Sequence, residues 1–173
     1  MPSRVREVLD SLIDRSGLDR ADGHPLYAYK VTPEELEQLQ QALKAALAIS
    51  PELKQQDHRA AFCLFGAEWF RRHHVDGPWK WNTITEDGLG LAGEAKDRFH
   101  ARDVRPITSD GLRWWNAKVV QTEFTTQYLV TLACQGGLPL KTLRNHSAPL
   151  RRFLKKVLKH HERYPHETLN QVV

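Results

Sequence analysis

The chain has few of the features that usually reveal a protein's compartment. Only two cysteines, Cys63 and Cys134, occur among its 173 residues. Both lie in apolar segments, so we expect two buried, reduced thiols. No apolar run approaches the roughly 18–20 residues that a helix needs to cross a bilayer. The N-terminus is charged from Arg4 onward and lacks the apolar block of a signal peptide. These absences predict a cytoplasmic protein without membrane contact.

Motifs for metals, nucleotides and nucleophilic catalysis are also absent. Nine histidines invite a metal hypothesis, but His73-His74 and His160-His161 are adjacent pairs, whose side chains point about 100° apart on a helix. The sequence has no H-E-x-x-H, no C-x-x-C and no glycine-rich phosphate loop. We therefore predict no metal site, no cofactor and no small-molecule substrate.

Glu68 is the only residue that invites a catalytic hypothesis, because it stands within an apolar helical segment. A buried carboxylate there is either a general acid or the partner of a nearby arginine such as Arg72, one turn later. Pairing is the commoner arrangement. We predict that the protein is not an enzyme and has no catalytic residues; an enzyme using Glu68 and a nearby histidine is the alternative.

Composition indicates one globular domain, residues 1–173. The chain is 40% hydrophobic and 27% charged, with a mean hydropathy of −0.55, and its length suffices for a substantial core. The net charge of +4 and pI near 9.2 favour nucleic acid over acidic partners only slightly. Two interpretations of the C-terminus remain open, a natural end or a cut within a longer protein of which this is the N-terminal part.

Apolar residues at helical spacing, with capping and stop signals, predict an all-α fold of six to eight helices. The expected helical segments are 3–16, 32–47, 58–74, 95–101, 108–135 and 147–164. Residues 121–126 interrupt the fifth with polar and β-branched side chains, so we expect a break or an outward polar face there. The longest irregular region, 75–93, is rich in glycine and tryptophan.

The stretch from Ala60 to Phe70 is apolar on nearly every side, which predicts a central helix buried on several sides. A basic, aromatic segment follows it directly. Its candidate contact residues are Arg71, Arg72, Trp79 and Lys80, to which we add Trp114.

The tryptophans have three interpretations. Beside cationic side chains they can stack on bases, as in single-strand binders. Tryptophan and arginine are also enriched in protein–protein hot spots. The third interpretation is burial against the core, which we favour for Trp69, Trp81 and Trp115, while Trp79 and Trp114 are the more open cases.

The predicted C-terminal helix carries a basic face opposite its leucines. Its cations are Arg151, Arg152, Lys155, Lys156 and Lys159. Such a face can neutralise several phosphates with strongly salt-dependent affinity. It can equally be a solvated surface or a dock for an acidic protein, and these alternatives stay open.

Two segments, G-P-W-K-W (Gly77–Trp81) and Y-L-V-T-L-A-C-Q-G-G-L-P-L-K-T-L (Tyr128–Leu143), resemble the N-terminal region of very large bacterial anti-phage defence-island proteins. The family includes the large subunit of a type III Druantia-like system. The resemblance implies antiviral defence and a place in a larger protein or complex. It carries over no catalytic residue.

Together these observations predict a non-enzymatic helical binding module in a bacterial defence assembly. We expect it to contact nucleic acid through the basic C-terminal helix and the tryptophan loop. The alternative is a protein–protein docking or scaffold domain without affinity for nucleic acid.

Overall fold

The computed structural model describes residues 3–18, 23–75 and 77–141, together with Ala148, Arg151, Arg152 and Lys155. In chain order its elements are α1 (Arg4–Ser16), the 3₁₀ turn η1 (Leu26–Tyr29), α2 (Pro33–Ile49), α3 (Gln56–His73), α4 (Asn82–Thr85), α5 (Gly93–Arg98), the π-helical turn η2 (Phe99–Asp103), α6 (Val104–Trp114) and α7 (Tyr128–Gly136). The predicted all-α class is confirmed. Within the described ranges, β pairing is limited to one isolated bridge between Gln121 and Thr126.

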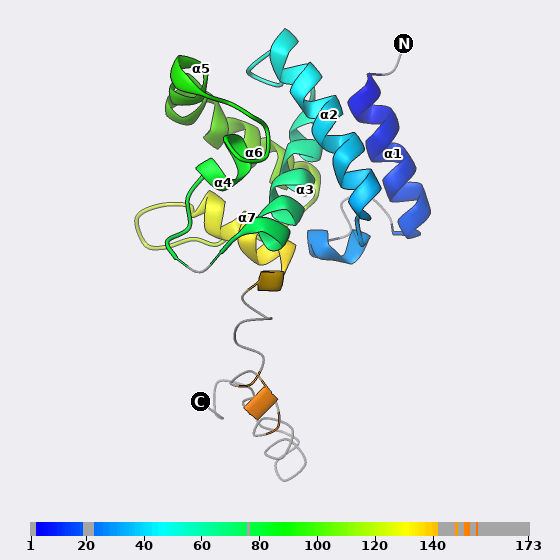
Figure 1. Ribbon diagram of the computed structural model, residues 1–173, viewed down its shortest axis with the longest axis vertical. Helices are drawn as coiled ribbons and strands as arrows, with labels where there is room; N and C mark the ends of the chain where they lie inside the picture. Colours follow the sequence, from blue (N-terminus) through cyan, green and yellow to red (C-terminus); the bar gives the residue numbers. More distant parts are fainter. Residues whose placement is uncertain are drawn as a thin grey trace.

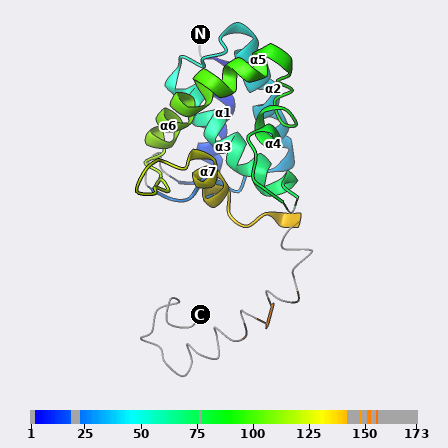
Figure 2. The same cartoon turned by 90° about the vertical axis from the view of Figure 1, so that its left-hand side faces the viewer.

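Helix α3 runs through the middle of the molecule and contacts α1, α2, α4, α6, α7 and η1. Helices α1 and α2 lie side by side on one flank, while α4, α5 and α6 lie on the other (Figures 1 and 2). Every residue from Ala60 to Glu68 is buried, so this part of α3 has no solvent face. The predicted central helix is confirmed, and its uniform apolar composition follows from contact on all sides.

Local capping explains where several helices begin and end. Ser3 Oγ accepts a hydrogen bond from the Arg6 amide at 3.2 Å and starts α1. The side chains of Thr32 and Glu35 form a reciprocal capping box at the start of α2. Gly17 ends α1 in the left-handed region, with φ of 66°. These signals are readable in the sequence, and the predicted boundaries of α1 and α2 are confirmed to within two residues.

One predicted helix start is wrong. The helix expected to begin near Thr108 begins at Val104, directly after η2. Helix α6 continues directly from η2, and the Val104 amide bonds to the Phe99 carbonyl five residues earlier, so Pro106 follows a point where the regular α-helical bonding is already interrupted. Helix α3 begins at Gln56, two residues before the predicted start.

The expected interruption at 121–126 is confirmed as a break. A short hairpin separates α6 from α7, closed by a 2.8 Å hydrogen bond from the Gln127 amide to the Val120 carbonyl. Phe124 near its tip is 92% exposed. Side-chain hydrogen bonding by Thr122 to Thr125 competes with helix formation at this point.

The cysteines differ in environment. Cys63 is fully buried in α3, its Sγ donates to the Thr108 carbonyl at 3.5 Å, and burial raises the pKa of the thiol far above its ordinary value. Cys134 is exposed, so the prediction that it is buried is wrong. Its position falls on the outer side of α7, which apolar composition alone does not reveal.

Close approach of α6 to α3 depends on Gly111. A Cβ at this position would overlap the Arg59 carbonyl oxygen and lie 2.5 Å from Cys63 Sγ. We predict that Gly111→Ala lowers the free energy of unfolding by about 2–3 kcal/mol, because the α3 backbone must move. Urea denaturation measures the loss.

Gly66→Ala is the matched control, since a Cβ there would first meet the flexible Leu132 side chain at 3.4 Å. We expect a change of less than about 1 kcal/mol for this variant. Equal unfolding free energies for the two variants would contradict the proposed role of Gly111.

Candidate docking groove at the C-terminal end of α3

Glu68 is held by two arginines of its own helix. Its side chain is only 4% exposed. Oε2 accepts from Arg71 Nε at 3.0 Å, and Oε1 accepts from Arg72 Nε at 2.9 Å as well as from Arg71 Nη2. The sequence-based pairing with Arg72 is thus confirmed, and Arg71 joins it. Both carboxylate oxygens thus accept hydrogen bonds from arginine.

An open groove of about 630 Å³ lies beside this ion-paired cluster, between η1, α3 and the end of α7. Its walls include three exposed apolar side chains, Tyr27 at 51%, Leu138 at 61% and Leu140 at 45% exposure. Arg71 and Lys30 also line it. Clustered exposed apolar residues of this kind are typical of interaction sites.

Contacts from distant parts of the sequence shape the groove. The Leu26 amide donates to Gln135 Oε1 at 3.2 Å, which ties η1 to α7. Gly137 has a φ of 80°, and a Cβ there would lie 3.3 Å from the Tyr27 ring. Glycine at this position therefore permits both the turn after α7 and the approach to Tyr27.

Charge in the groove is positive. Among its lining residues Arg71 and Lys30 are cationic and none is acidic. Because Glu68 neutralises only one of its two arginine partners, the ion-paired cluster keeps one net positive charge. The second arginine, Arg72, also donates to the Val31 carbonyl at 2.5 Å and fixes the chain after η1. The groove therefore combines apolar walls with fixed cations.

The predicted contact residues of the tryptophan loop lie near this end of α3. Trp79 is 42% exposed, and its ring meets Phe70 edge-on at a centroid distance of 5.4 Å. Lys80 beside it is exposed. Trp79 is thus partly packed on α3 and partly exposed to solvent.

Trp114 lies at the opposite end of α3. It shares a surface hollow with Gln55 and Asp57, whereas Trp79 packs on Phe70. Thirteen residues of helix between Asp57 and Phe70 correspond to roughly 20 Å. The two tryptophans that the sequence leaves open therefore belong to separate surfaces.

The remaining tryptophans contact the core. Trp115 is 1% exposed, and its Nε1 donates to the Ala60 carbonyl at 2.9 Å. Trp69 and Trp81 are partly buried against the core. The predicted burial against the core is confirmed for Trp115. It is confirmed in part for Trp69 and Trp81, which are only partly buried.

Three cations of the predicted C-terminal helix, Arg151, Arg152 and Lys155, are helical and exposed. Lys156 and Lys159 lie outside the described residues. The expected proximity between this basic face and the tryptophan loop stays a prediction.

Arg71 is a predicted contact residue, but Tyr27, Lys30, Leu138 and Leu140 were not predicted to form a site. Leu26 and Tyr29 in the same turn are each 1% exposed, whereas Tyr27 faces outward. The sequence contained one signal for this surface: Leu138 and Leu140 flank Pro139 directly after two glycines. A chain that turns at this point cannot bury both leucines within a helix.

Neither a metal centre nor a membrane span is found in the part of the chain that the structure describes. No group of three or more histidine, cysteine, aspartate or glutamate residues within it is arranged to hold a metal ion. No described helix combines the length and apolarity needed to cross a bilayer.

The structure is a small all-α domain with an apolar, cationic groove. The chain belongs to the YjiT N-terminal domain family, whose model matches residues 2–138. It is 29% identical over 157 residues to Protein YjiT of Escherichia coli strain K12, an alignment that covers 89% of this chain. The chain spans only 29% of the length of that relative. No solved structure matches the chain significantly.

Loss of the Glu68 charge should destabilise the fold. We predict that Glu68→Gln costs about 3 kcal/mol, since it leaves two largely buried arginines without their counter-charge. Urea denaturation at neutral pH gives this value. The exposed Glu37→Gln is the control and should change it by less than about 0.5 kcal/mol; a Glu68→Gln protein as stable as this control would rule out the stabilising role.

Proposed function

We propose that this domain is a non-enzymatic docking module of a larger bacterial protein, and that it binds an acidic, amphipathic protein segment. The groove between η1, α3 and the end of α7 carries this proposal. Its exposed apolar walls favour a partner with apolar side chains, and its two cations favour a partner with carboxylates.

The immobility of Arg71 adds to the suitability of the groove for docking. Its guanidinium is held by Glu68, so binding a carboxylate costs little further side-chain entropy. Binding modules gain affinity through such preorganisation. The length of the relative, of which this chain spans 29%, supports a partner segment in the same large protein or in its complex.

The wider context we propose is bacterial antiviral defence in the cytoplasm. Its support is the resemblance of Gly77–Trp81 and Tyr128–Leu143 to defence-island proteins. The second of these segments supplies the end of α7 and two leucines of the groove. Residues that carry the resemblance therefore also line part of the proposed docking groove.

Docking can be tested with synthetic helical peptides of about 14 residues, long enough to present two apolar turns. One peptide carries leucine at helical spacing with glutamate elsewhere, and its matched control carries lysine in place of glutamate. We expect the acidic peptide to bind in calorimetry and the basic one to bind at least about tenfold more weakly.

Leu138→Asp/Leu140→Asp should abolish that binding, because it places carboxylates on the apolar wall of the groove. Val119→Asp is the control, since Val119 is 39% exposed and lies outside the groove. Circular dichroism verifies that both variants are folded. Equal binding of the two peptides, or retained binding by the double variant, would contradict the docking proposal.

A second candidate function is nucleic-acid binding. Its specific support is the exposed cations Arg151, Arg152 and Lys155 together with the half-exposed Trp79 beside Lys80. Aromatic faces beside cations suit single strands. The fixed arginines Arg71 and Arg72 contribute less to this function than the sequence suggests, because Glu68 neutralises one of their two charges.

Affinity for DNA and RNA should be measured over a salt series with wild type and Lys155→Glu/Lys159→Glu. For the nucleic-acid function we expect binding that weakens steeply with salt and falls at least about tenfold on charge reversal. Lys54→Glu/Lys118→Glu reverses two exposed cations elsewhere and serves as the control. Absence of binding at low salt, or equal loss in both variants, would eliminate this candidate.

A further inference from the structure

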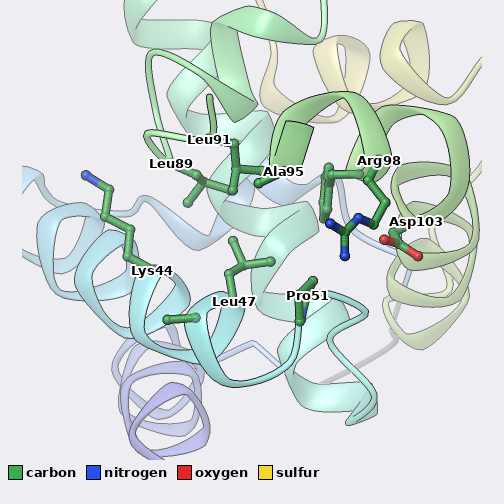
Figure 3. Close-up of a pocket in the computed structure, with 10 residues that line it drawn as sticks. Lys44, Leu47, Pro51, Leu89, Leu91, Ala95, Arg98 and Asp103 are labelled. Atoms are coloured by element: carbon green, nitrogen blue, oxygen red, sulfur yellow. The ribbon is translucent and has the colours of Figure 1, made fainter. Parts of the chain in front are cut away.

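A second cavity is separate from the groove and shares none of its lining residues. It has a volume of about 280 Å³ and lies between α2, the loop before α5, and the turn η2 (Figure 3). Its apolar lining includes Leu47, Pro51, Leu89, Leu91 and Phe99. Pockets for drug-sized ligands begin at roughly 300 Å³, so an occupant of this cavity is small.

Asp103 lines this cavity and is incompletely satisfied. Its side chain is only 6% exposed, and Oδ1 accepts from Arg102 Nε at 3.1 Å. Oδ2 is buried and has no hydrogen-bond partner. A buried carboxylate oxygen without a donor is costly, and native proteins retain few such atoms.

The backbone that carries Asp103 is unusual. Asp103 ends the π-helical turn Phe99–Asp103, which joins α5 to α6. Single π turns inside helices are rare and frequently occur at functional sites. The turn brings the ring of Phe99 and the carboxylate of Asp103 to the same cavity.

Arg98 supplies the opposite charge. It comes immediately before the π turn, and its guanidinium and the Asp103 carboxylate lie on the same side of the cavity (Figure 3). No ion pair joins these two described residues, although both line the cavity. Lys44 adds a second cation on the α2 side.

The two signs of charge restrict the chemistry of an occupant. A simple amine would satisfy Asp103 but face Arg98 and Lys44. A simple carboxylate would suit the cations but leave Asp103 Oδ2 without a donor. A small zwitterion with an apolar body satisfies both charges and fills the apolar lining.

We propose that this cavity binds a hydrophobic α-amino acid. Its ammonium group donates to Asp103, its carboxylate pairs with Arg98, and its aliphatic side chain lies against Leu47, Leu89 and Phe99. Binding requires the Asp103 carboxylate to rotate, because Oδ2 is buried in the protein without ligand. The sequence predicted no small-molecule substrate; this ligand is bound without reaction, and the site is independent of the docking groove.

Three probes separate the contributions of the two charges. The full chain is titrated with L-leucine, isoamylamine and 4-methylpentanoate, which carry both charges, the amine alone and the carboxylate alone. Amide chemical shifts in NMR report binding and its location. We expect L-leucine to shift signals of residues around the cavity and to bind at least about tenfold more tightly than either analogue.

Variants then connect binding to the named residues. Asp103→Asn and Arg98→Gln should each weaken L-leucine binding at least about tenfold. Arg105→Gln, an exposed arginine on α6 outside the cavity, should not change it. Ala95→Leu fills the cavity and should abolish binding, and thermal unfolding verifies that each variant is folded.

Three results would overturn the proposal. The first is no shift at about 10 mM L-leucine, a concentration that detects even weak millimolar binding. The second is binding of isoamylamine or 4-methylpentanoate as tight as that of L-leucine. The third is unchanged L-leucine affinity in folded Asp103→Asn.

Discussion

Burial of α3 on every side is the constraint on which the rest of this structure depends. A helix without a solvent face needs neighbours that approach its backbone closely, and small residues make that approach sterically feasible. Gly111 of α6 lies against the Arg59 carbonyl, and Gly136 of α7 lies against the Ala67 carbonyl. These two crossings set the positions of α6 and α7 and, with them, of the groove.

The single charge buried within α3 has a structural role of the same kind. Glu68 would be costly in this core without partners. Arg71 and Arg72, one turn later, satisfy it and reach outward to the groove and to the Val31 carbonyl. The buried carboxylate thus holds Arg71 at the groove that we propose as the docking site. In this way the packing of the core and the electrostatics of the groove are linked.

The charged side chains of the two proposed sites are arranged differently. In the groove, the arginines are already paired with Glu68, and the surplus charge is available for weak, adaptable contact with a protein segment. In the cavity, Asp103 and Arg98 are close in the sequence but form no ion pair, and Asp103 Oδ2 has no donor. A buried carboxylate oxygen without a donor is costly in the empty site and therefore favours a ligand that supplies one.

The sequence by itself determined the all-α class, the central apolar helix, the caps of α1 and α2, and the pairing of Glu68 with Arg72. Each of these follows from local spacing or from contacts within one turn. Tertiary structure decided which side of α7 faces solvent, and so exposed Cys134. It also separated Trp79 from Trp114, brought Tyr27 beside Gly137, and placed Asp103 and part of α2 around one cavity. Such contacts join residues far apart in the chain, and their geometry depends on how helices cross, which no local pattern specifies.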